Sequence, residues 1–63
     1  MTISAEVGRR IKQYRQKLNL TLKEIESRVD VSATHVSEIE RGKTSPTIGA
    51  LAQIAKAFDV DPA

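Results

Sequence analysis

The sequence has no cysteine, one histidine and only two aromatic residues among its 63 positions. Without cysteine, the chain can form neither a disulfide framework nor a cysteine-based zinc site. A metal site at His35 would need two or more further ligands in suitable geometry. There is no second histidine and no Gly-rich phosphate loop to support catalysis. We therefore expect no enzymatic activity, no metal, no cofactor and no small molecule bound by this domain.

Long apolar runs are also missing. No stretch approaches the roughly 20 residues of a membrane span. The N-terminus lacks the pattern of a signal peptide, so we expect no membrane partner and a cytoplasmic location. The length allows a single domain over residues 1–63. A chain this short buries only about 60% of the surface that it exposes when unfolded, so its core must come from aliphatic residues on well-capped helices.

The apolar residues that are present repeat at helical spacing along nearly the whole chain. The stripes consist of Val7, Ile11, Tyr14 and Leu18; Leu22, Ile25 and Val29; Val36 and Ile39; and Ile48, Leu51, Ile54, Ala55 and Phe58. They predict an all-α fold, a compact bundle of four short helices over about residues 5–18, 22–29, 33–41 and 48–58. No segment shows the sustained alternation of a β-strand.

Capping signals mark the predicted helix ends. The predicted N-caps are Ser4, Thr21, Ser32 and Thr47. Glu24 fits a capping box with Thr21, and Gly42 suits the left-handed residue just past a helix end. Only residues 30–32 separate the second and third helices, which predicts a steep crossing of the helix-turn-helix type. An ordinary corner in a small helical bundle fits this spacing equally well.

Several segments match a known family in order. They are Arg15, residues 18–25, Val31-Ser32, residues 36–43 (Val-Ser-Glu-Ile-Glu-Arg-Gly-Lys), Pro46-Thr47-Ile48 and residues 51–60. The sequence thereby resembles the Cro/phage-repressor-like helix-turn-helix proteins, the XRE class of bacterial and phage transcriptional regulators. Many members carry a fifth helix after the region of Val60. The chain stops there, which leaves open that it is the N-terminal part of a longer protein.

The resemblance implies a lambda-repressor-like fold and binding to double-stranded DNA in the cytoplasm, at the nucleoid. The simplest function is that of a repressor acting as a homodimer on a two-fold operator, with residues 33–41 as the recognition helix in the major groove. The base-facing positions are Ala33, Thr34, Ser37 and Glu38. Ala33 and Thr34 could touch a thymine methyl, and Glu38 could accept from cytosine N4. Because the first turn and a half of this helix contains no Arg, Gln or Asn, we expect modest specificity.

Other positions are assigned to the DNA phosphates or to the scaffold. The expected phosphate contacts are Arg10, Ser32, Arg41, Lys43 and Thr44. For Ser32, helix capping alone is a sufficient explanation, and Thr34 and Ser37 could be plain surface. Arg15 lies on the apolar stripe of the first helix, and Glu40 lies beside the inward face of the third. A partly buried Arg needs a partner, and a bidentate carboxylate is the best one. The resemblance implies that Arg15 pairs with Glu40, so we expect a structural ion pair between these two residues.

Two residues depart from the family pattern. Glu26 replaces a small Ala where the second and third helices pack closely. Its side chain must turn out toward solvent, pair with a basic side chain such as Lys23 or Arg28, contact another chain, or loosen the packing of the two helices. Asp30 replaces a turn Gly and would adopt a left-handed conformation at some cost.

The net charge of +2 hides segregated blocks. Residues 1–23 hold six basic side chains and one acid, whereas residues 24–40 hold five acids and one Arg. A basic surface attracts phosphate, although the first helix could simply have a solvated face. The acidic block and Glu26 favour an alternative function, a non-enzymatic protein-interaction module such as an antitoxin or a bridging coactivator.

Overall fold

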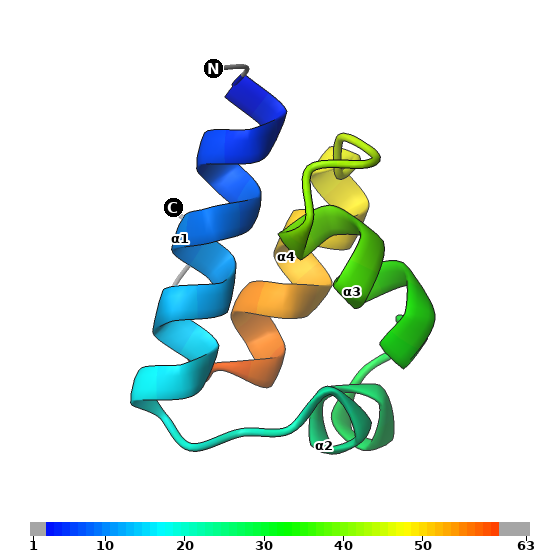
Figure 1. Ribbon diagram of the computed structural model, residues 1–63. Helices are drawn as coiled ribbons and strands as arrows, with labels where there is room; N and C mark the ends of the chain where they lie inside the picture. Colours follow the sequence, from blue (N-terminus) through cyan, green and yellow to red (C-terminus); the bar gives the residue numbers. More distant parts are fainter. Residues whose placement is uncertain (1–2, 60–63) are drawn as a thin grey trace.

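A computed structural model describes residues 3–59, and within this range all regular structure is α-helical. The helices are α1 (Ile3–Lys17), α2 (Leu22–Arg28), α3 (Ala33–Glu40) and α4 (Ile48–Ala57) (Figure 1). The predicted all-α, four-helix fold is confirmed for these residues. Each helix ends one residue before its predicted end, and α1 begins two residues earlier than predicted.

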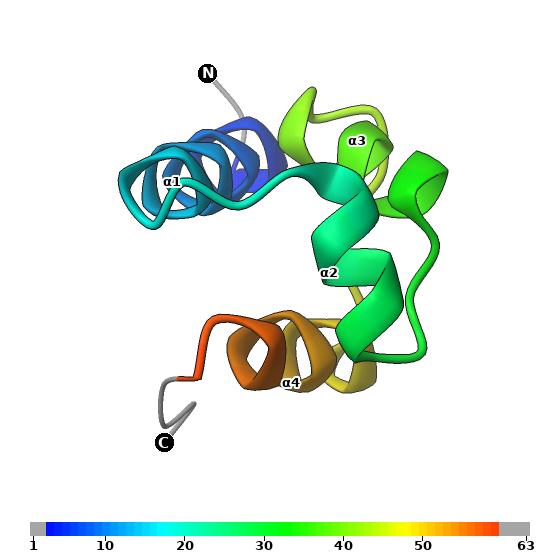
Figure 2. The same cartoon turned by 90° about the horizontal axis from the view of Figure 1, so that it is seen from below.

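The packing centres on α3. This helix packs against α1 and α2, and α2 also packs against α4. Figure 2 shows α2 crossing between α3 and α4, while α1 and α4 lie on separate sides of the molecule. The largest fully buried side chains are Ile25, Val36, Ile39 and Ile54, which come from α2, α3 and α4. The core therefore fixes the second and third helices to each other.

Side-chain caps begin three of the helices where the sequence predicts them. Thr21 Oγ1 accepts from Glu24 N–H at 3.0 Å, and Glu24 Oε1 accepts from Thr21 N–H at 2.9 Å, which completes the capping box. The pKa of Glu24 is lowered mainly by the hydrogen bond that its carboxylate accepts from the Thr21 N–H, and further by the Thr21 side chain. Ser32 and Thr47 cap α3 and α4 in the same way, each accepting an N–H three residues on. These caps fix where the short helices start.

Two expected features of the helix ends are wrong. Ser4 is not the N-cap of α1, because the helix has already begun at Ile3. Asp30 has no positive φ. The chain leaves α2 in the extended conformation at Val29 (φ −141°, ψ 172°), so the turn needs no left-handed residue. The left-handed positions in the described residues are Asn19, Gly42 and Asp59, which follow α1, α3 and α4.

The stripe of Val36 and Ile39 is wholly buried, whereas the first and fourth stripes are only partly buried. Tyr14 of α1, Leu18 just after α1 and Leu51 of α4 are about two-fifths exposed, and Ile48 is 88% exposed. The stripes on α1 and α4 are partly exposed because these two helices lie apart. The rings of Tyr14 and Phe58 make a contact between them, with a centroid distance of 5.3 Å. A mainly apolar hollow of about 310 Å³ remains here, lined by Val7, Arg10, Ile11, Tyr14 and Phe58.

Candidate nucleic-acid interface

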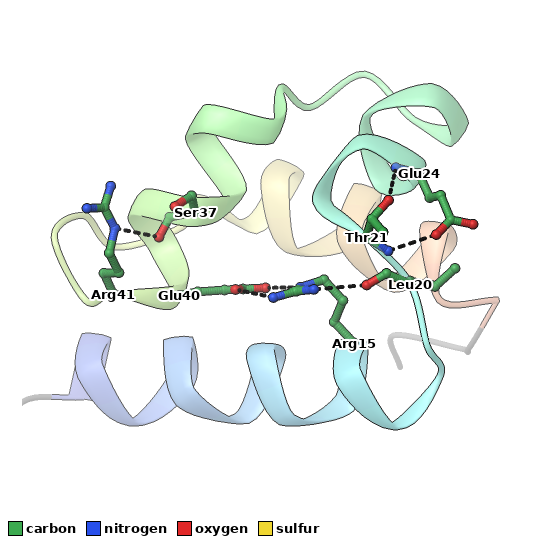
Figure 3. A network of polar contacts seen from close by, with 7 residues as sticks. All are labelled: Arg15, Leu20, Thr21, Glu24, Ser37, Glu40 and Arg41. Atoms are coloured by element: carbon green, nitrogen blue, oxygen red, sulfur yellow. Dashed lines mark hydrogen bonds and ion pairs between the residues drawn. The ribbon is translucent and has the colours of Figure 1, made fainter.

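A buried ion pair attaches α3 to α1. Arg15 donates through Nε to Glu40 Oε2 at 2.7 Å and through a terminal nitrogen to Glu40 Oε1 at 3.0 Å (Figure 3). Its other terminal nitrogen donates to the carbonyl of Leu20 at 2.9 Å. The side chains of Arg15 and Glu40 are only 14% and 4% exposed. The hydrogen bond to Glu40 raises the pKa of Arg15. The structure thus brings together the two residues expected to pair.

A close backbone approach joins the same two helices. Gly8 of α1 is buried against the end of α3. A Cβ atom at Gly8 would lie 2.0 Å from the carbonyl oxygen of Ile39 and 2.9 Å from that of Glu40. Only glycine allows this spacing, so Gly8 permits the close approach of α1 and α3 that the ion pair also supports.

The outward face of α3 carries the four residues expected to face bases. Thr34 is exposed, and Ala33, Ser37 and Glu38 are partly exposed. A carboxylate oxygen of Glu38 lies 4.0 Å from His35 Nδ1 on the same helix. The structure therefore leaves these side chains accessible on a helix whose other face is buried.

The loop after α3 is held in a defined conformation. Gly42 has a φ of +73°, and the N–H groups of Gly42 and Lys43 donate back to the carbonyls of Ile39 and Glu38. This pattern is a Schellman motif. A Cβ at Gly42 would lie 3.1 Å from Ala5 Cα, and the hydroxyls of Ser4 and Ser45 are hydrogen-bonded to each other. The loop thus rests on the start of α1, which positions Lys43 and Thr44.

The expected phosphate contacts occupy different surroundings. Lys43 is exposed and Thr44 partly exposed. Arg41 is exposed and donates to the Ser37 carbonyl at 3.3 Å. Arg10 pairs with Glu6 at 3.1 Å, yet its side chain stays 75% exposed. The hydrogen bond from Arg10 lowers the pKa of Glu6. Ser32 is exposed, and its hydroxyl accepts from His35 N–H as an N-cap.

Glu26 finds partners on two sides. Its Oε2 accepts from the backbone N–H of Ala33 at 3.1 Å, and its Oε1 lies 3.7 Å from Lys23 Nζ. Pairing with Lys23 was among the alternatives that the sequence leaves open, whereas the bond to the start of α3 was not. The carboxylate joins α2 to α3 at the helix-turn-helix corner.

Two structural residues have only weak signals in the sequence. Gly8 interrupts an otherwise good helical pattern, where an internal glycine costs stability unless packing requires it. Arg28 donates to the Ala57 carbonyl at 3.1 Å and so ties α2 to the end of α4. No sequence pattern marks this bond, because its acceptor is a backbone oxygen 29 residues away.

The part of the chain that the structure describes shows neither a metal-binding group of side chains nor a membrane-spanning helix. Residues 3–59 contain no group of three His, Cys, Asp or Glu side chains that could hold a metal ion. No helix among them is long and apolar enough to span a membrane.

Fold and surface together define a class: the helix-turn-helix DNA-binding domains of transcriptional regulators. The sequence pattern of the helix-turn-helix family matches residues 11–63. The chain therefore belongs to this family, and the resemblance and the lambda-repressor-like fold inferred from the sequence are confirmed.

Several curated proteins are similar to the chain. The HTH-type transcriptional regulator SinR of Bacillus subtilis is 36% identical over 55 residues, which cover 86% of this chain and 50% of SinR. DdrOP3 of Deinococcus deserti, another HTH-type transcriptional regulator, is 31% identical over 81% of this chain and 40% of its own length. An HTH-type regulator of Archaeoglobus fulgidus is 36% identical over 79% of the chain and 70% of the relative. No solved structure matches significantly.

The chain spans about half the length of the first of these relatives. What the whole relative binds or controls is therefore no direct guide to this domain. The family assignment rests on the helix-turn-helix region that all of them share.

Proposed function

We propose that this domain binds double-stranded DNA with α3 in the major groove and acts as the DNA-binding part of a repressor. The proposal rests on the observation that α3 is held against α1 with its outer face accessible. Gly8 and the Arg15–Glu40 pair fix its inner face, while its outer face stays accessible. A helix held in this way can present side chains to base edges without reorganising.

In this arrangement Ala33, Thr34, Ser37 and Glu38 face the bases. The residues placed at the phosphates are Arg10, Ser32, Arg41, Lys43 and Thr44. Small and hydroxyl side chains provide methyl contacts and single hydrogen bonds, so base discrimination is modest and DNA shape contributes to site choice. The domain has no catalytic role and works in the cytoplasm, where bacterial DNA lies.

We also propose that the domain binds its operator as a homodimer. Two copies of α3 reach successive major grooves when they are about 34 Å apart along the duplex. A two-fold operator then matches a two-fold protein. Because the chain corresponds to half of SinR, the contacts that hold the dimer need not lie in this domain.

A protein-interaction module has weaker support. Of the acids in residues 24–40, Glu24 is used in a capping box, Glu26 caps α3 and Glu40 pairs with Arg15. The acidic block therefore serves mainly internal contacts, which leaves little of it for a basic protein partner.

Binding to a short mixed-sequence duplex across a range of salt concentrations tests the proposal. With Arg10, Arg41 and Lys43 at phosphates, the slope of log K against log salt is expected near −3 per domain, because each neutralised phosphate contributes about −0.9. Lys43→Ala is expected to make the slope shallower by about one. Fluorescence anisotropy measures both.

Lys17→Ala is the matched control, since Lys17 lies at the end of α1 and is assigned no phosphate. Its slope is expected to equal that of the wild type. Absence of duplex binding at low salt would contradict the proposal and favour the protein-interaction module.

A further inference from the structure

We infer that Glu26 lowers the affinity of the DNA-binding surface, because its carboxylate already accepts from the first amide of α3 and places a negative charge there. This inference rests on the proposed function. Glu26 belongs to α2, yet its Oε2 accepts from Ala33 N–H, the first amide of the recognition helix. The side chain remains 40% exposed, so the negative charge is part of the accessible surface.

The first amides of a helix lack intrahelical acceptors and attract anions. In α3 two of these donors are already used, since Ala33 N–H goes to Glu26 and His35 N–H goes to Ser32. A phosphate or a base acceptor that approaches Ala33 therefore meets a carboxylate instead of a free N–H. The Glu26 carboxylate therefore competes with DNA acceptors for the Ala33 N–H.

Glu26 also engages a cation. Lys23 is highly exposed, with 86% of its side chain accessible, and its Nζ lies 3.7 Å from Glu26 Oε1. The Glu26 carboxylate therefore competes with DNA phosphates for Lys23, as Glu6 does for Arg10. Since phosphate contacts dominate non-specific binding, this competition weakens binding to duplex DNA of arbitrary sequence.

Glu26→Gln tests this idea because the amide oxygen can still accept from Ala33 N–H while the charge is lost. With a mixed-sequence duplex, the variant is expected to bind about two- to fivefold more tightly at low salt, as fits one unit charge near a phosphate in water. The salt slope is expected to steepen by about one as Lys23 becomes available. Glu26→Ala, which restores the residue usual in the family, is expected to change binding in the same direction.

Asp59→Asn is the matched control. It removes one negative charge at the end of α4, which Figures 1 and 2 place away from the start of α3. Asparagine tolerates the positive φ of 59° at this position. Binding by this variant is expected to stay within twofold of the wild type.

Adding Lys23→Ala to Glu26→Gln is expected to return the salt slope to the wild-type value. The inference is overturned if both Glu26 variants, folded by circular dichroism, bind the duplex no more tightly than Asp59→Asn does. That result differs from failure of the proposed function, in which the wild type itself does not bind the duplex at low salt.

Discussion

Gly8→Ala is expected to destabilise the domain by about 3 kcal/mol, at the upper end of the usual cost of overpacking. The added methyl would meet the Ile39 carbonyl oxygen at 2.0 Å, so α1 and α3 must move apart along their contact. A domain of this size has a total stability of only about 3–9 kcal/mol. Chemical denaturation should therefore show a midpoint shifted to lower denaturant concentration by an amount that corresponds to about 3 kcal/mol.

Gly49→Ala controls for the effect of glycine on helix propensity. Gly49 lies in the first turn of α4, and a new Cβ there would lie 3.8 Å from Thr47 Oγ1, at ordinary van der Waals distance. The same substitution there is expected to stabilise the domain by about 0.5–1 kcal/mol. If Gly8→Ala were as stable as the wild type, the close approach of α1 to α3 would be refuted.

Arg15→Met is expected to cost about 3–5 kcal/mol, because it leaves the Glu40 carboxylate buried without its partner. Glu40 is only 4% exposed, and the Leu20 carbonyl loses its donor as well. At about 4–8 °C per kcal/mol for a small domain, the melting temperature should fall by more than about 12 °C. Thermal unfolding followed by circular dichroism measures the shift.

The double variant Arg15→Met/Glu40→Leu separates loss of pairing from loss of packing. Replacing both charges with apolar side chains is often neutral or stabilising, so we expect it to recover most of the lost stability. Arg9→Met removes one of the two exposed partners of Glu6 and is expected to change the melting temperature little. An unchanged or raised melting temperature for Arg15→Met would show that the pair has no structural importance.

Local signals account for the features that the sequence predicts well. The capping box of Thr21 and Glu24 and the Gly42 terminus depend on residues within one turn of each other, so their patterns can be read directly. The periodicity of apolar residues gives the four helices for the same reason. The Arg15–Glu40 pair is a longer-range contact; an Arg on an apolar stripe indicates that a partner is needed, and the family resemblance identifies Glu40 as that partner.

Tertiary context accounts for the rest. Gly8 is explained only by a carbonyl more than thirty residues away, and Glu26 by an amide of the next helix. The stripe positions Tyr14, Leu18 and Leu51 remain partly exposed because α1 and α4 diverge, which periodicity within one helix cannot reveal. Which outward side chains of α3 meet bases depends on the DNA and stays a prediction.

The most direct test of DNA binding through α3 is a titration of the ¹⁵N-labelled domain with a short duplex, followed through its backbone amide signals. The shifts are predicted to concentrate on residues 32–38 and 41–44 and at Arg10, while the last turn of α4 stays unchanged. Shifts confined to the hollow lined by Val7, Tyr14 and Phe58, or no shifts at low salt, would contradict the proposal.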